Sequence, residues 1–250
     1  MSTTSARYII SPAVRFSSDE DGTTLLHITD NRIYGLVGVG NVIWQKLGKS
    51  KAGLAASDIV RQLGSEFRDV ATHQLERDVV RLLDSFEEKH LVETSKNTPT
   101  LKTCLTDCVS DAFLLSFNKL IRLLSYLRMY TLATFLAFTV VDLILRFLGF
   151  KYLYDLVRHW PTAEEDAGSA GTAQLWAAIC RGITWYPKQV MCLQRSVVTT
   201  WLFRSRGLPA QMVIGCQRRP FLVHAWTELN GEVVNDRQSV REVHKIIDRC

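Results

Sequence analysis

The chain has 250 residues, of which 47% are hydrophobic and 22% charged; this balance excludes a disordered protein and is typical of one large or two small globular domains. The net charge of +5 is unevenly divided, because residues 1–95 carry 11 basic and 13 acidic side chains, a net −2, and residues 96–250 carry +7. Phosphate contacts dominate affinity for DNA and RNA, so the acidic first part argues against a nucleic-acid-binding domain.

Six cysteines are spaced too irregularly for a disulfide scaffold in a chain of this size, namely Cys104, Cys108, Cys180, Cys192, Cys216 and Cys250. The N-terminal sequence MSTTSARYII lacks the basic and apolar pattern of a secretory signal. We therefore expect a cytoplasmic protein whose cysteines are reduced.

Three strands are predicted at the start of the chain. They lie at Tyr8–Phe16, Thr23–Ile28 and Arg32–Leu36, with polar turns between them, and together they suggest a meander. Pro12 cannot donate a hydrogen bond to a neighbouring strand, so the first strand is expected at an edge of the sheet.

Three helices are predicted next. The first two span Gly38–Leu47 and Ala55–Glu66, and Ser57 is a candidate cap of the second if that helix begins late. The third carries apolar residues at helical spacing, namely Leu75, Val79, Leu82 and Phe86, and is expected to end near His90. Residues 1–95 thus predict one small domain of strands followed by helices.

Lys96–Thr100 is the predicted linker, and an apolar helical stretch, Phe113–Leu148, follows it. Its uncharged part, Met129–Val141, has 13 residues, whereas a membrane-spanning helix needs about 20. We therefore expect buried or interfacial helices that form an extension over residues 100–160. A surface that docks a partner or a membrane is the first alternative, and a true membrane span is the second.

Cys192 is expected at the start of a helix. Val197 and Trp201 keep helical spacing after it, and Gly207 followed by Pro209 is a typical helix end. Unpaired backbone N–H groups and the helix dipole favour an anion at a helix N-terminus. This position therefore favours a thiolate nucleophile.

Three further strands are predicted at Gln211–Cys216, Phe221–Glu228 and Val233–Asp236. The second of them contains His224, and Asp236 ends the third. If Asp236 holds one imidazole nitrogen of His224, the other nitrogen is free to accept the thiol proton of Cys192.

The register of the last hairpin decides whether this histidine and aspartate meet. A two-residue loop of Asn230 and Gly231 would pair Leu229 with Glu232 and place the two side chains on opposite faces. A three-residue loop would pair Glu228 with Glu232 and bring them directly opposite each other. We predict the three-residue loop.

The order of a helical cysteine, a strand histidine and an aspartate on the next strand is typical of papain and transglutaminase folds. It favours acyl transfer that begins with thiolate attack on an amide carbonyl. The backbone N–H of Cys192 is the expected oxyanion donor, and Gln189 is a candidate for the second donor.

Each of these residues also has a structural interpretation. Cys192 could be a small core residue, His224 a satisfied core histidine and Asp236 a turn cap. A zinc site formed by Cys192, Cys216 and His224 lacks the usual paired-ligand spacing. The order and spacing of the three residues together favour a catalytic triad over these alternatives.

Four motifs resemble those of the lasso-peptide maturation B proteins, the McjB family of transglutaminase-like cysteine peptidases: Cys192–Ser196 (CLQRS), Gly207–Gly215 (GLPAQMVIG), Pro220–Trp226 (PFLVHAW) and Gly231–Asp236 (GEVVND). The resemblance covers Gln174–Asp236 well and is looser before it. It implies that Cys192, His224 and Asp236 form the catalytic triad of a papain/transglutaminase-like α+β domain over residues 100–250.

Residues 1–95 resemble a PqqD-like precursor-recognition element, a small winged-helix domain. The similar positions are Thr24–Ile28, Arg32–Leu36, Ile43, Trp44, Ile59, Leu63 and Arg77–Leu83. Such domains bind a leader peptide by strand addition beside the third strand, with the last helix as the other wall. The candidate leader-binding residues are Ile33, Tyr34 and Leu36 on that strand, and Leu75, Val79 and Leu82 on that helix, where they line the groove or pack in the core.

The resemblance implies a leader peptidase: the first domain holds the leader of a precursor peptide, and the second cleaves it off through a thioester acyl-enzyme. It also implies an asparagine-synthetase-like cyclase as a partner. The ATP requirement reported for this family is assigned to that cyclase, and we expect no cofactor and no metal on this chain. Association with a membrane surface or an exporter stays open. Two alternatives are a transglutaminase-like acyltransferase and a non-catalytic peptide-binding adaptor.

Overall fold

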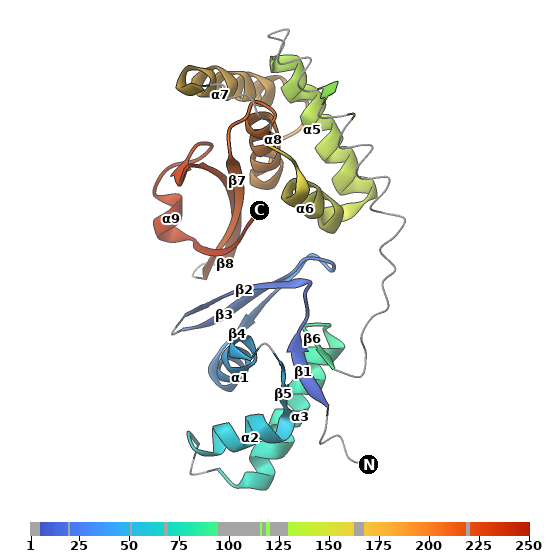
Figure 1. Ribbon diagram of the computed structural model, residues 1–250, viewed down its shortest axis with the longest axis vertical. Coiled ribbons are helices and arrows are strands. Elements are labelled where there is room, and N and C mark those ends of the chain that lie inside the picture. The colour runs from blue at the N-terminus through green and yellow to red at the C-terminus, as the bar shows by residue number, and fades with distance from the viewer. Residues whose placement is uncertain are drawn as a thin grey trace. The chain divides into compact units, whose positions relative to one another are not determined.

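The computed structural model describes residues 6–19, 21–50, 52–67, 70–94, 116, 119–120, 130–162, 168–218 and 221–250. The chain divides into two compact units, Met1–Leu101 and Lys102–Cys250, each with a hydrophobic core of its own (Figure 1). The predicted linker Lys96–Thr100, the cysteines Cys104 and Cys108, and most of the apolar stretch before Tyr130 lie outside the described residues.

The meander of the first unit consists of β2 (Val14–Asp19), β3 (Gly22–His27) and β4 (Arg32–Leu36), which are antiparallel and lie in that order. The turn between β2 and β3 is fixed by Asp19, whose carboxylate accepts hydrogen bonds from the backbone N–H groups of Asp21 and Gly22 at 3.0 and 3.1 Å. β3 is the central strand and is buried along its whole length, whereas β4 lies at an edge.

The first predicted strand, Tyr8–Phe16, is in fact two strands. β1 (Arg7–Ile10) ends before Pro12, and β2 begins at Val14, because proline interrupts the hydrogen bonding of a strand. β1 pairs with β5 (Leu54–Ala55) and β6 (Val92–Thr94) in a second small sheet, which the sequence did not predict. The meander therefore has the predicted number of strands but begins later than predicted.

The three predicted helices of the first unit are confirmed as α1 (Gly38–Lys49), α2 (Ala56–Gly64) and α3 (Thr72–Glu88). The Ser57 cap is wrong, because α2 begins one residue earlier and no side chain caps it. Trp44 of α1 is fully buried and makes edge-to-face contacts with Phe16 and Phe86, at centroid distances of 5.8 and 5.6 Å. This cluster joins α1, α3 and the meander into one core.

The second unit contains an antiparallel sheet in the order β10-β7-β8-β9. Its strands are β7 (Ala210–Arg218), β8 (Phe221–Leu229), β9 (Glu232–Val233) and β10 (Lys245–Arg249). Before β10, the four-residue α9 (Val240–Val243) connects it to the preceding loop. The sequence predicted β7 and β8, but its third strand, Val233–Asp236, overlaps β9 only at Val233. It did not predict β10, which pairs with the outer side of β7.

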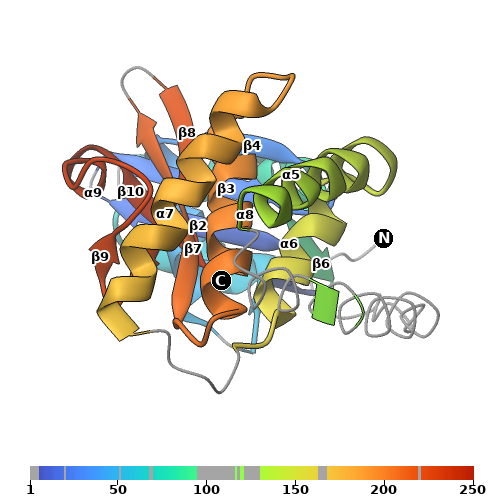
Figure 2. The ribbon, with the colours of Figure 1, turned by 90° about the horizontal axis from the view of Figure 1, so that it is seen from above.

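The helices of the second unit surround α8 (Cys192–Arg204). α7 (Gly168–Trp185) and α5 (Tyr130–Phe147) run on either side of α8 in both ribbon views, and α6 (Gly149–His159) also contacts it (Figures 1 and 2). Because α8 also packs against β7 and β8, its residues from Ser196 to Arg204 are all buried. Helices packed on an antiparallel sheet give the second unit the predicted α+β fold class.

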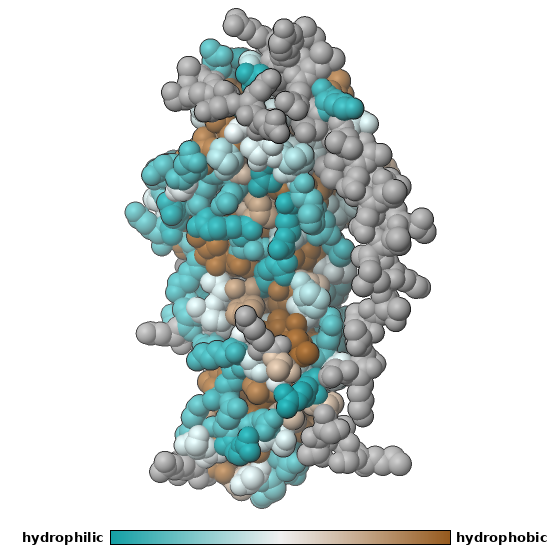
Figure 3. Space-filling model, in the orientation of Figure 1, coloured by the Kyte–Doolittle hydropathy of each residue, from teal (hydrophilic) through white to brown (hydrophobic). Residues whose placement is uncertain are grey.

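α5 is the one described helix that is long and apolar enough to cross a membrane by length and composition, a test that a core helix of a soluble protein also meets. Ala133, Ala137 and Val141 recur at one-turn spacing and are fully buried, as predicted, where α5 meets α7 and α8. Leu143 and Phe147 are exposed, and the face drawn in Figure 3 shows that apolar areas interrupt the polar surface. The exposed side of α5 leaves the docking alternative open.

Candidate active site

Cys192 is the first residue of α8, as predicted. Met191 precedes the helix in an extended conformation, and its backbone N–H donates to Oε1 of Gln194 at 2.8 Å. This is one half of a capping box, in which the side chain of the third helical residue reaches back over the first turn. The Cys192 thiol therefore lies where the unpaired N–H groups of a helix favour negative charge.

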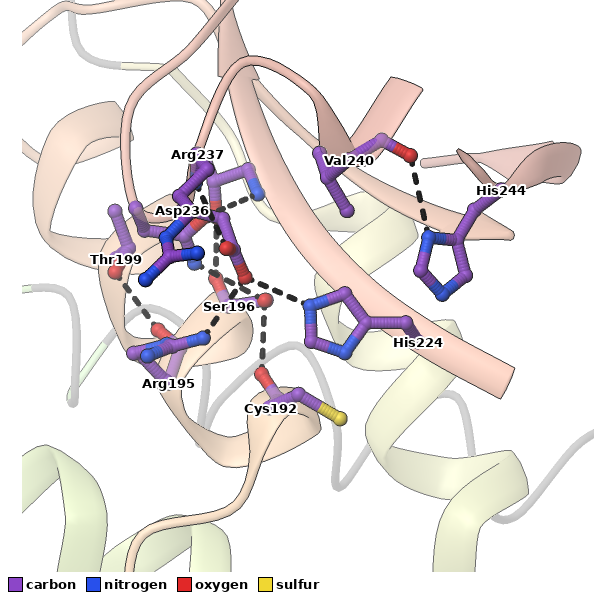
Figure 4. A network of polar contacts seen from close by, with 11 residues as sticks. Cys192, Arg195, Ser196, Thr199, His224, Asp236, Arg237, Val240 and His244 are labelled. Carbon is purple, nitrogen blue, oxygen red and sulfur yellow. Dashed lines mark hydrogen bonds and ion pairs between the residues drawn. The ribbon is translucent and has the colours of Figure 1, made fainter. Parts of the chain in front are cut away.

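His224 projects from β8 between this thiol and Asp236. Its Nε2 lies 2.7 Å from Oδ2 of Asp236, and its other ring nitrogen points toward the sulfur of Cys192 (Figure 4). Since Nε2 faces the carboxylate, the other ring nitrogen is the one available to the thiol. The structure thus brings together the three residues that the sequence proposed as a triad.

The predicted three-residue loop of the last hairpin is wrong. Leu229 pairs with Glu232, and the loop consists of Asn230 and Gly231, whose φ angles of 51° and 85° are typical of a type I′ turn. In a regular strand this register would place His224 and Asp236 on opposite faces. The two side chains meet by another route.

β9 ends at Val233, two residues after the turn, so the register no longer controls Asp236. Val234 N–H still donates to the carbonyl of Thr227, but the N–H of Thr227 donates to the side chain of Asn235, at 2.7 Å, and not to backbone. The chain therefore leaves the sheet at Asn235, and Asp236 lies in a bend from which its carboxylate reaches the imidazole.

Asn235 also ties this bend to α8. Its Nδ2 donates to Oγ of Ser196 at 3.1 Å, and that hydroxyl donates to the carbonyl of Cys192 at 2.8 Å. Asn235 is buried, so these hydrogen bonds are shielded from water. A continuous path of hydrogen bonds thus connects the segment that carries the aspartate with the residue that carries the thiol (Figure 4).

Arg195 is a further site residue that the sequence reasoning missed. Its Nη2 donates to Oδ2 of Asp236 at 3.0 Å, and the backbone N–H of Arg237 donates to Oδ1 at 2.8 Å. Arg195 follows Cys192 by three residues on the helix, a spacing that places both on one face and was the available signal. With His224 the carboxylate has three donors, which fixes its orientation.

Aromatic rings support His224 from the side. The ring of Trp226 lies 6.4 Å from it and that of the buried His244 lies 5.3 Å from it, centroid to centroid. Gly215 pairs with His224 on the neighbouring strand, and a Cβ there would lie 2.6 Å from the Trp226 ring. The indole can occupy this place because residue 215 has no side chain.

The electrostatics of the three residues favour a thiolate and an imidazolium. Burial opposes ionisation of Cys192, but hydrogen bonds from His224 and from the backbone N–H groups of Ala225 and Leu193 outweigh it, and the pKa of the thiol is lowered. The contact with Cys192 raises the pKa of His224 against the effect of burial, and Asp236 adds to it. Burial also opposes ionisation of Asp236, but His224, Arg237 N–H and Arg195 lower its pKa.

The zinc alternative does not fit this geometry. Cys216 pairs with Val223, the neighbour of His224, so it points to the opposite face of the sheet from the imidazole. Among the described residues no group of three His, Cys, Asp or Glu side chains could hold a metal ion. Gln189, the candidate second oxyanion donor, is exposed, and that role stays a prediction.

The candidate leader-binding residues divide into two groups. Ile33, Tyr34 and Leu36 lie on the edge strand β4 and are half-buried. On α3, Leu75 and Val79 are buried in the core of the first unit. Leu82 packs at the margin of this core and is partly exposed, so of the three α3 residues it is the one that a peptide beside β4 could contact.

Both units match known protein families. Residues 135–248 match the transglutaminase-like superfamily, and residues 22–92 match the family of coenzyme PQQ synthesis protein D, PqqD. The chain is therefore similar to these two families in two successive regions, a PqqD-like domain followed by a transglutaminase-like domain. The PqqD-like domain holds β4 and α3, and the transglutaminase-like domain holds Cys192, His224 and Asp236.

A curated relative is the Microcin J25-processing protein McjB of Escherichia coli, which is 36% identical over 56 residues. That match covers 22% of this chain and about a quarter of the relative's length. A solved structure, TbiB1 in complex with the TbiA(beta) leader peptide, is 32% identical, and the alignment covers 34% of this chain and 94% of that one with a TM-score of 0.31.

Proposed function

We propose that this protein is a cysteine peptidase of lasso-peptide maturation that removes the leader from a precursor peptide. The observation that carries the proposal is the arrangement of a thiol at a helix N-terminus, an imidazole in contact with that thiol and a carboxylate 2.7 Å from the imidazole. The transglutaminase-like match and the similarity to a microcin-processing protein support a peptide as the substrate.

In the proposed reaction the Cys192 thiolate attacks the carbonyl carbon of the scissile amide, and a carbon–sulfur bond forms. The imidazolium of His224 gives its proton to the departing amine as the carbon–nitrogen bond breaks, which leaves a thioester. His224 then takes a proton from water, and the resulting attack releases the carboxylic acid and the free thiolate. Asp236 keeps the imidazole in the orientation that both steps need.

We propose that the PqqD-like domain holds the leader as an added strand beside β4. Among the described strands β4 pairs with β3 alone, so its other edge can accept backbone hydrogen bonds. Half-buried Ile33, Tyr34 and Leu36 would flank the leader, and Leu82 of α3 would form the opposite wall. The cyclase as a partner, its role in any ATP requirement and a cytoplasmic location belong to the same proposal.

The test is cleavage of the cognate precursor by the Cys192→Ala variant, with the cyclase present and the products weighed by mass spectrometry. We expect cleavage to be lost, because the nucleophile is removed, while binding of a labelled leader is retained. Cys180→Ala is the matched control, since this cysteine is exposed and lies on α7 outside the triad. Cleavage that survives in the Cys192 variant would end the peptidase assignment.

The same assay judges the two alternatives. The transglutaminase-like domain is also compatible with transfer of the acyl group to an amine, and a product that is heavier than the hydrolysed one by the mass of the amine less one water would favour that reaction. A non-catalytic adaptor would bind the leader and leave the precursor intact with wild-type protein.

A further inference from the structure

Asp142 is an acidic residue in the middle of the apolar helix α5, and its carboxylate is largely buried, with 12% of the side chain exposed. Burial of a charge is unfavourable unless partners compensate for it. Three donors do so: the hydroxyl of Tyr186 and Nζ of Lys188, each at 2.8 Å from Oδ2, and the amide of Gln194 at Oδ1. Burial opposes ionisation, but these contacts keep the pKa of Asp142 lowered.

The three partners lie on both sides of the segment that leads into the nucleophile. Tyr186 and Lys188 follow the end of α7, and Gln194 is in the first turn of α8. One carboxylate of α5 therefore fixes the chain before and after Cys192. The packing of α5 does not require three hydrogen bonds to one carboxylate, because α5 already has apolar contacts with α7 and α8.

Gln194 transmits the effect because its amide has a donor end and an acceptor end. An ionised carboxylate can only accept hydrogen bonds, so Asp142 requires the NH₂ group of Gln194 to face it. The amide oxygen then faces Met191, whose N–H it accepts at 2.8 Å. Without Asp142 the amide could rotate and leave this N–H, directly before Cys192, unpaired.

We infer that Asp142 is a positioning residue for the nucleophile: through Gln194 it fixes the first turn of α8 and thereby the place of the Cys192 sulfur beside His224. This inference rests on the proposed function, in which Cys192 is the nucleophile. The thiolate depends on the N–H of Leu193 and on the imidazole, so a loosened first turn weakens both contacts at once. The charged or titratable groups around the thiol are His224, Asp236 and Arg195.

The test measures the rate at which iodoacetamide alkylates Cys192 between pH 5 and 10, with the site resolved by mass spectrometry, in the full chain. We expect Asp142→Asn to slow alkylation at neutral pH about tenfold and to move the pH profile upward, the effect of losing one charge-assisted hydrogen bond. Gln194→Glu should do the same, because it places two carboxylates together. The double variant restores one donor and one acceptor, and we expect its rate to return to within about threefold of wild type.

Asp155→Asn is the control, since Asp155 pairs with Lys151 on the exposed surface of α6, and its alkylation profile should match wild type. Gln194→Met offers a second route if Asp142→Asn fails to fold, because it keeps the shape of the side chain and removes both hydrogen bonds. It should show the same loss.

Unchanged alkylation in folded Asp142→Asn and Gln194→Met, or a double variant no faster than the slower single one, would overturn the inference. The readout needs no peptide substrate. Failure of the peptidase proposal, seen as cleavage by Cys192→Ala, is therefore distinguishable from failure of the positioning role.

Discussion

The proton balance between Cys192 and His224 decides how the site responds to pH. The pKa of the thiol is lowered from its ordinary 9.0, and that of the imidazole is raised from 6.5. Both shifts favour a thiolate beside an imidazolium. Acid opposes this state by protonating the thiolate. Alkali opposes it by deprotonating the imidazolium, which in the proposed reaction supplies a proton to the leaving amine.

We predict that Cys192 is alkylated by iodoacetamide faster than Cys180 at pH 7, because the pKa of Cys180 is raised by burial while that of Cys192 is lowered. Peptide mapping after short exposure measures both rates in one sample. His224→Gln should bring the rate of Cys192 down toward that of Cys180. Equal rates in the wild-type protein would mean that the thiol is not activated.

Peptide cleavage should have a narrower pH range than alkylation. Alkylation needs only the thiolate and persists in alkali, whereas cleavage also needs the imidazolium and falls as pH rises through the raised pKa of His224. The pH at which cleavage declines while alkylation persists therefore reports the deprotonation of His224.

At the scale of elements, the early end of β9 positions the aspartate. Asn235 takes the place of a backbone partner for Thr227 and bonds Ser196 at the same time. Without this side chain the bend would keep its contact with Arg195 but lose its buried attachment to α8, and the Asp236 carboxylate would be held less firmly beside the imidazole.

We predict that Asn235→Ala lowers the free energy of unfolding by about 2–4 kcal/mol, since it leaves the buried N–H of Thr227 unpaired and removes one of the hydrogen bonds of the Ser196 hydroxyl. It should also reduce cleavage in the fraction that remains folded. Urea denaturation measures the first effect and precursor cleavage the second. Ser239→Ala, in the same loop but exposed and without a side-chain cap hydrogen bond, should cost about 0.5 kcal/mol; an equal cost in both variants would argue against the anchoring role.

Local patterns predicted the elements that position the thiol and the imidazole. The apolar spacing after Cys192 and the glycine and proline at its end define α8, and the β-forming run around His224 defines β8. These signals are contained in short stretches of sequence, so they can be found without knowledge of the fold.

The two-residue loop could have been predicted, since Asn-Gly is typical of a type I′ turn, but the way in which Asp236 reaches His224 could not, because it depends on a distant side chain. The sequence argument assumed that the strand continues to Asp236, but Asn235 ends it by bonding across to Ser196, 39 residues earlier. The Asp142 and Gln194 contact joins residues 52 apart, and strands as short as β5 and β9 carry no periodic pattern. Contacts of this kind appear only when the chain is folded.

At the scale of the whole molecule, the division into two compact units suggests a division of labour. The core of the PqqD-like domain is built around Trp44 from described residues of the first unit, and Cys192, His224 and Asp236 all lie in the transglutaminase-like domain. In the proposed function, the covalent connection of the two units would raise the local concentration of the bound precursor at the thiol, as the linking of two binding modules does.

We predict that residues 1–101, produced alone, bind the leader peptide with the affinity of the full chain, measured by fluorescence anisotropy. In residues 102–250 produced alone, Cys192 should be alkylated at the wild-type rate, but the precursor should be cleaved slowly. Mixing the two pieces at micromolar concentration should not restore the full rate of cleavage. Full recovery would mean that the covalent connection contributes nothing. A folded first piece that ignores the leader would remove the recognition role.

Gly215 illustrates how an absent group can decide the geometry of a site. A methyl group there would collide with the indole that lies beside the imidazole, and the carbonyl of Lys245 closes the other direction at 3.0 Å. Saturation mutagenesis at this codon, selected for a working enzyme, should therefore recover almost nothing except the wild-type residue. Residue 215, which has no proposed contact with the substrate or with the transferred proton, would then tolerate substitution as poorly as Cys192.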